Sequence, residues 1–137
     1  SVGEFSICER ILSINIIDTG NVKPKWKCEY TVYILEIETE ITVNGIPTET
    51  RLYRSYKRYS ELYIFNDILQ GQNIQTTEFP PKHIAVKPSK TVVQNRKDTF
   101  QKYFNCLTSQ CTTPDSKANK LLLQFLPEMS STPSSPV

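Results

Sequence analysis

Basic and aromatic side chains alternate in one short stretch of the sequence, Arg54-Ser55-Tyr56-Lys57-Arg58-Tyr59-Ser60-Glu61-Leu62. A guanidinium group can contact two phosphate oxygens at once, and an aromatic ring beside it can stack on a sugar. The stretch therefore has the residue types that bind a sugar phosphate. It also fits a structural role, in which the long basic side chains of an edge strand extend toward water and Tyr59 packs in the core. Taken alone, the stretch favours the structural role.

Residue sets typical of enzymes are missing from the sequence. A single histidine, His83, cannot build a multi-histidine metal site, and no glycine-rich phosphate loop is present. Because His83 follows two prolines, we expect it to be an exposed loop residue. The sequence therefore predicts a protein that is not an enzyme and that binds neither a metal nor a cofactor.

The charge distribution points to an anionic partner. The formal net charge is only +2, but residues 51–102 contain ten Lys and Arg against four Asp and Glu. A basic middle of this kind favours binding to a negatively charged surface or ligand. An ordinary solvated surface would give the same counts, so charge alone does not decide between the two interpretations.

Cysteine spacing and hydropathy indicate where the protein works. No two of the four cysteines, Cys8, Cys28, Cys106 and Cys111, have the two-residue spacing of a zinc knuckle or a redox motif. We expect reduced thiols in a cytosolic protein. No apolar run approaches the roughly 18 residues of a membrane-spanning helix, and the first residues do not form a signal peptide. Membrane contact is therefore expected to be peripheral. Because the first residue is not Met, we expect a piece of a larger protein.

The N-terminal third has the pattern of β-strands. Closely spaced isoleucines between residues 7 and 17 predict a strand that ends in a turn at Asp18-Thr19-Gly20. After a loop at residues 23–26, apolar and acidic residues alternate strictly between residues 33 and 41. One face of this strand has Tyr33, Leu35, Ile37, Thr39 and Ile41, and the other has Glu36, Glu38 and Glu40. Asn44-Gly45 favours a hairpin turn, and residues 51–56 are the returning strand.

Helical patterns follow the strands. Ser60 can cap a helix that ends near Gly71 and has the apolar residues Leu62, Phe65, Ile68 and Leu69. After an extended proline segment, a second helix has the apolar stripe Val93, Phe100, Tyr103, Phe104 and Leu107. Asp115 can cap a short last helix that stops at Pro127. This order predicts the α+β class, with a three-stranded antiparallel N-terminal sheet packed against three or more helices and a proline-containing loop.

Four elements in this order resemble the PX (phox-homology) domain family of the sorting-nexin type. Residues 57–62, Lys-Arg-Tyr-Ser-Glu-Leu, resemble the family signature Arg-Arg-Tyr-Ser-Glu-Phe. Pro80-Pro81-Lys82 resembles the family's proline segment, and Arg96 is followed by apolar residues four, seven and eight positions later, as in the family. Residues 122–126 resemble the closing Leu-x-x-Phe-Leu helix. The resemblance covers residues 5–128 and leaves a disordered Ser/Thr/Pro-rich tail or linker at 129–137.

The resemblance implies a site for a phosphoinositide headgroup, most of all that of phosphatidylinositol 3-phosphate. Arg58 would bind the 3-phosphate, and Tyr59 would stack beneath the inositol ring. Lys82 would pair with the 1-phosphate, and Arg96 would bond to the 4- and 5-hydroxyls. Each residue also has a structural alternative, because a cation can pair with a carboxylate or stay solvated and Tyr59 can pack in the core.

In this family, the loop between the proline segment and the second helix touches or enters the bilayer. The matching residues here include Ile84, Val86 and Val92 as candidates for insertion. Lys87 and Lys90 would each add about 1 kcal/mol near an anionic leaflet. The alternative is that Ile84 and Val86 pack inward.

The implied function is that of a cytoplasmic membrane-targeting module, peripheral on the cytosolic face of endosomes or the vacuole. Protein partners would act through the rest of a larger host protein. The first alternative is a PX-fold protein-interaction module with weak or no lipid binding, which would use the acidic face at Glu36, Glu38 and Glu40. Nucleic acid is not an expected partner, because the aromatic residues match no RNA-binding motif.

Overall fold

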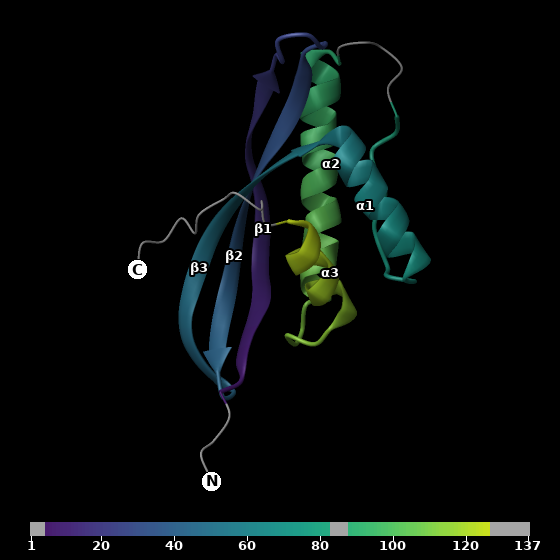
Figure 1. Ribbon diagram of the computed structural model, residues 1–137. Helices are drawn as coiled ribbons and strands as arrows, with labels where there is room; N and C mark the ends of the chain where they lie inside the picture. Colours follow the sequence, from purple (N-terminus) through teal and green to yellow (C-terminus); the bar gives the residue numbers. More distant parts are fainter. Residues whose placement is uncertain (1–4, 83–87, 127–137) are drawn as a thin grey trace.

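A computed structural model of the chain describes residues 5–82 and 88–126. Within these ranges, three strands precede three helices. The elements are β1 (Ile7–Val22), β2 (Tyr30–Val43), β3 (Ile46–Arg58), α1 (Tyr59–Gly71), α2 (Lys90–Ser109) and α3 (Lys117–Phe125). The strands form an antiparallel sheet in the order β1-β2-β3, and the helices lie along one side of it (Figure 1). The predicted α+β class is confirmed.

The alternating pattern of β2 separates core from surface as the sequence predicted. Every second residue from Tyr33 to Ile41 is buried, while Glu36, Glu38 and Glu40 are only partly buried. The hairpin to β3 turns at Asn44 and Gly45, whose φ angles are 51° and 80°. Both residue types tolerate the positive φ that the tight hairpin turn requires.

The core lies between the sheet and the two longer helices. The apolar stripe of α2 is buried from Phe100 to Leu107, and Val93 is packed against the edge of the cluster. α1 contributes Leu62, Phe65 and Leu69. The ring of Phe100 meets that of Tyr33 edge to face at 5.2 Å, which joins α2 to β2.

A glutamine of α2 occupies the position that a neighbouring strand would take along β1. The Oε1 atom of Gln101 accepts a hydrogen bond from the backbone N–H of Ile16 at 2.8 Å. Its Nε2 atom donates to the backbone carbonyl of Ile14 at 2.9 Å. Because an edge strand presents unpaired backbone groups, this amide both satisfies them and fixes α2 along the sheet.

Asn119 of α3 repeats the arrangement further along the same edge. Its Oδ1 atom accepts from the backbone N–H of Ile11 at 2.8 Å, and its Nδ2 atom donates to the carbonyl of Glu9 at 2.9 Å. The side chain is fully buried. The amide therefore ties the last helix to the first strand, across a sequence separation of more than a hundred residues.

The first strand is longer than the sequence indicated. A turn was predicted at Asp18-Thr19-Gly20, but β1 continues to Val22, with Asp18 paired to Ile34 and Gly20 to Val32. The register shifts between Ile16 and Asp18. A bulge of this kind bends and twists a strand without ending it. Asp18, Thr19 and Gly20 therefore stay paired with β2.

Three details of the helices also differ from the prediction. The N-cap of α1 is Arg58 rather than Ser60, because the Glu61 carboxylate accepts the backbone N–H of Arg58 at 2.9 Å. The N-cap of α3 is Ser116 rather than Asp115. Ile68 was expected in the core but is 47% exposed, because α1 buries only one narrow stripe.

We expect Asn119→Ala to lower the free energy of unfolding by about 2–3 kcal/mol, because it leaves one buried and one partly buried backbone group of β1 unpaired. Urea denaturation followed by circular dichroism measures this. Gln124→Ala is the matched control, since Gln124 is an exposed amide on the same helix. Equal stability of the two variants would contradict a role for Asn119 at the sheet edge.

Candidate functional site

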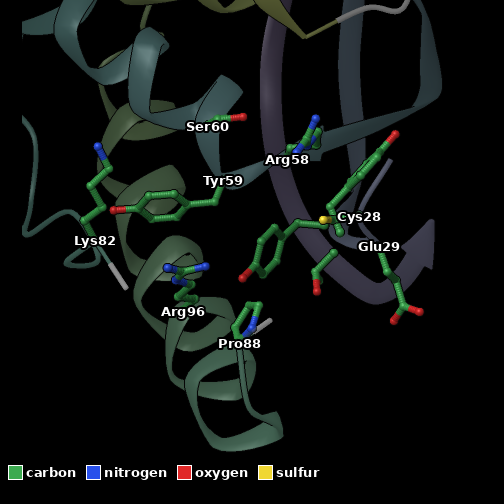
Figure 2. A pocket seen from close by; sticks show the side chains of 11 residues that line it. Cys28, Glu29, Arg58, Tyr59, Ser60, Lys82, Pro88 and Arg96 are labelled. Carbon is green, nitrogen blue, oxygen red and sulfur yellow. The ribbon is translucent and has the colours of Figure 1, made fainter. Parts of the chain in front are cut away.

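A pocket of about 280 Å³ lies where the start of β2, the junction of β3 with α1, the proline segment and α2 meet. Its lining consists of Cys28, Glu29, Tyr30, Thr31, Tyr33, Arg58, Tyr59, Ser60, Lys82, Pro88 and Arg96. All four residues expected to hold a headgroup are in this set. In Figure 2, Arg96 lies below Tyr59, Lys82 lies on one side of the ring, and Arg58 and Cys28 lie on the other. The volume is near the lower end for small-molecule pockets, about 300 Å³, which suits a ligand of one sugar ring.

The strand-to-helix junction places Arg58. This residue ends β3 and has extended backbone angles, φ −83° and ψ 159°, as the N-cap of α1. Its backbone N–H is held by Glu61, so the acidic residue of the motif fixes the direction in which the arginine leaves the strand. The guanidinium carbon lies 3.7 Å from the centre of the Tyr30 ring, and the side chain is exposed.

A cluster of aromatic rings around Phe79 fixes the position of the proline segment that carries Lys82. The ring of Phe79 packs at 5.3–5.9 Å from four aromatic rings, Tyr59, Tyr63, Phe100 and Tyr103. The hydroxyl of Tyr59 donates to the carbonyl of Pro80 at 2.6 Å. These contacts hold the proline segment against the helices, and the Lys82 ammonium lies 5.4 Å from the centre of the Tyr63 ring.

Arg96 is the buried cation of the pocket. It comes from the second turn of α2, and only 7% of its surface is exposed. Its guanidinium carbon lies 3.9 Å from the centre of the Tyr59 ring. One face of Tyr59 is therefore covered by Arg96.

Two buried polar atoms at this site lack a hydrogen-bond partner among the described residues. They are the Nε atom of Arg96 and the hydroxyl of Tyr33. Burial raises the pKa of Tyr33, and the nearby Arg96 guanidinium opposes that rise, so the hydroxyl stays protonated at neutral pH. Buried polar groups are normally paired. The Arg96 guanidinium and the Tyr33 hydroxyl therefore lie near each other, but these two atoms form no hydrogen bond of good geometry.

The three cations of the pocket keep their charge available. Arg58, Lys82 and Arg96 form no ion pair with a carboxylate in the part of the chain that the structure describes. Glu29 is the acidic residue of the lining, so the lining has a formal charge of +2. The pocket is therefore suited to an anion that carries more than one negative charge.

The residues predicted to contact the membrane are only partly described. Ile84, Val86 and Lys87 lie outside the described residues. Lys90 and Val92 were expected in the loop but belong to the first turn of α2, because the Ser89 hydroxyl accepts the Val92 N–H at 3.2 Å and starts the helix there.

Sequence reasoning missed part of the lining. Tyr30 and Tyr33 belong to the second strand, and Cys28 and Glu29 precede it. Nothing in the local pattern of β2 distinguishes Tyr33 from an ordinary core residue. Tyr30 could have been suspected as an aromatic residue at the start of a strand, but its partner, Arg58, is distant in sequence.

One comparison with known proteins shows a family, and a second shows a similar fold. The model of the PX domain matches residues 48–128. A solved structure described as the X-ray structure of a designed CISK-PX domain is similar, with a TM-score of 0.61 and 21% sequence identity, over 83% of this chain and 97% of that one. At this level of identity the likeness concerns the fold. A comparison with curated proteins found no match.

We expect Tyr33→Phe to leave the protein as stable as the wild type or about 1 kcal/mol more stable, because it removes a buried hydroxyl without a partner and keeps the ring packed on Phe100. Tyr103→Phe is the matched control. The Tyr103 hydroxyl donates to Asn66 at 2.7 Å, so its removal should cost about 1 kcal/mol. Urea denaturation compares the two variants. A loss in Tyr33→Phe as large as that in the control would show that the Tyr33 hydroxyl is paired in the protein.

Proposed function

The chain belongs to the PX domain family of phosphoinositide-binding, membrane-targeting modules, and from that premise we propose that it binds phosphatidylinositol 3-phosphate on the cytosolic face of endosomes or the vacuole. The observation that supports this most is the meeting of Arg58, Tyr59, Lys82 and Arg96 in one pocket. These residues come from distant parts of the sequence, and an anionic, ring-shaped ligand can use all of them. Among the described residues, no helix is long and apolar enough to cross a membrane.

Each residue has a distinct part in this proposal. Arg58, exposed at the rim, grips the 3-phosphate through two parallel hydrogen bonds. Lys82 neutralises the 1-phosphate, which links the ring to the lipid and therefore has to point toward the bilayer. Tyr59 stacks beneath the inositol ring. Arg96 donates to the 4- and 5-hydroxyls from the interior of the pocket.

Selectivity follows from the burial of Arg96. A hydroxyl can approach a buried guanidinium with little loss of solvation. A phosphate at the same position is larger and doubly charged, and it would have to lose its hydration beside a side chain that is only 7% exposed. Headgroups phosphorylated at the 4- or 5-position are therefore rejected by steric conflict and by desolvation.

We assign the module to residues 5–128, with 129–137 as a linker. The PX model begins at residue 48, but β1 and β2 lie before it and are required for the site, since β2 supplies Tyr30 and Tyr33. Ile84, Val86, Lys87, Lys90 and Val92 remain the proposed membrane contacts.

Arg58→Ala is expected to reduce binding to liposomes containing phosphatidylinositol 3-phosphate about 30-fold or more, because a charged bidentate contact is worth roughly 2–3 kcal/mol. Liposome sedimentation or surface plasmon resonance measures the loss. Arg54→Ala is the control, since Arg54 is exposed on the same strand and does not line the pocket. If wild type ignores every phosphoinositide, the lipid proposal fails and the protein-interaction alternative stands.

Arg96→Lys keeps the charge but removes the guanidinium fork. We expect affinity for the 3-phosphate lipid to fall about tenfold, and the preference over lipids that also carry a 4- or 5-phosphate to shrink, because the smaller ammonium leaves room for the extra group. A liposome panel of all phosphoinositides measures both quantities. Lys102→Ala, at an exposed residue of the same helix, should change neither. An unchanged preference in Arg96→Lys would remove Arg96 from the selectivity argument.

A further inference from the structure

Arg58 lies on the boundary between two pockets. One is the headgroup pocket. The other lies against the outer face of the sheet, and its lining includes Arg58 together with Tyr30, Tyr56 and Glu61. The side chain of Arg58 is exposed, and arginine has many rotamers of similar energy. A neighbouring group therefore has to hold the guanidinium on the side of the headgroup pocket.

A carboxylate does not hold this guanidinium. Glu61 is the acidic residue closest to Arg58 in the sequence, and its carboxylate accepts the backbone N–H of Arg58 at 2.9 Å. Within residues 5–82 and 88–126, the guanidinium of Arg58 forms no ion pair. This arrangement leaves the positive charge available to a phosphate.

The guanidinium of Arg58 instead contacts the ring of Tyr30. Its carbon atom lies over the ring, 3.7 Å from the centre, which is the contact distance of stacked carbon atoms, roughly 3.5–4.0 Å. At this distance the guanidinium has to lie roughly parallel to the ring, because a perpendicular group would bring a nitrogen atom too close. The N–H donors lie in the plane of the guanidinium, so stacking leaves them free to bond outward.

The strand register explains how Tyr30 reaches Arg58. Val32 is paired with Arg58 in the β2–β3 ladder, and Tyr30 lies two residues before Val32, on the same face of the sheet. Such diagonal neighbours are within reach of each other when one is aromatic and the other is long. Tyr30 is only partly buried, and among the described residues it belongs neither to the core cluster nor to the side chains packed against it. Core packing therefore does not account for this tyrosine.

We propose that Tyr30 is a positioning residue for Arg58, whose ring holds the guanidinium at the headgroup pocket with its N–H donors directed to the 3-phosphate. The inference rests on the proposed function, because it takes Arg58 as the group that binds this phosphate. Ordering a flexible arginine when the ligand arrives costs conformational entropy. The stacked ring orders the side chain beforehand and so increases the affinity.

Binding of a soluble short-chain phosphatidylinositol 3-phosphate, measured by isothermal titration calorimetry, tests this role. Tyr30→Leu should weaken binding about three- to tenfold, because the cation loses its aromatic partner. Tyr30→Phe keeps the ring and should bind as wild type does. Tyr56→Leu is the matched control, because Tyr56 is 47% exposed on the same face of the sheet and does not line the headgroup pocket. A loss in Tyr30→Phe as large as that in Tyr30→Leu would overturn the proposal.

A double-mutant cycle separates positioning from a general structural role. The ammonium of Arg58→Lys does not stack on a ring as a guanidinium does. When Tyr30→Leu is added to Arg58→Lys, we therefore expect a further loss of affinity of less than about twofold. The same loss in both backgrounds would mean that Tyr30 supports the fold or touches the ligand itself, and the positioning role would be wrong.

NMR tests the position of Arg58 without any ligand. The ring current of Tyr30 should shift the Arg58 side-chain protons upfield in wild type and in Tyr30→Phe, and the shift should disappear in Tyr30→Leu. Unshifted signals in wild type would contradict the stacking. If wild type binds the soluble lipid and Tyr30→Leu binds it equally well, the positioning role fails and the proposed function survives. If wild type binds no phosphoinositide, both fail.

Discussion

The site depends on holding three positive charges in one small pocket without neutralising them. Carboxylate partners would fix these side chains, but they would also compete with an anionic ligand. The structure uses aromatic rings instead, with Arg58 at 3.7 Å from Tyr30, Lys82 at 5.4 Å from Tyr63 and Arg96 at 3.9 Å from Tyr59. The ring quadrupole attracts a cation while leaving its charge in place, so the pocket is ordered and still positive.

This constraint explains much of the surrounding architecture. The rings come from two elements, Tyr30 from β2 and the other two from α1, so the sheet and the first helix must keep a fixed relation. Phe79 packs into the same aromatic group and sets the path of the proline segment. Gln101 holds α2 along β1 through two hydrogen bonds to the β1 backbone. Arg96 lies about one and a half turns before Gln101 on the same helix, so these bonds also fix where Arg96 lies along the pocket.

The sequence predicted those features that a local pattern encodes. Strict alternation identified β2, an apolar stripe identified α2, and the basic-aromatic motif located Arg58 and Tyr59. Prediction from the sequence failed where the end of a strand or the start of a helix depends on residues elsewhere in the chain. The continuation of β1 through Asp18 depends on pairing with β2, and the helix start at Tyr59 depends on a carboxylate that bonds backward to the N-cap. The tyrosine beneath Arg58 could not be assigned either, because it lies 28 residues earlier and no spacing rule connects the two.

The interior of the pocket shows why binding and stability oppose each other here. A guanidinium nitrogen and a phenol hydroxyl are buried side by side without partners, and each such group costs free energy in the unliganded protein. A core made only for stability would use apolar groups of the same shape at both positions. Retaining Arg96 makes sense if a ligand bonds to its terminal nitrogens, since the guanidinium could then turn slightly and direct its Nε–H toward the Tyr33 hydroxyl. The unpaired groups then lower the stability of the unliganded protein, and ligand binding recovers part of that free energy.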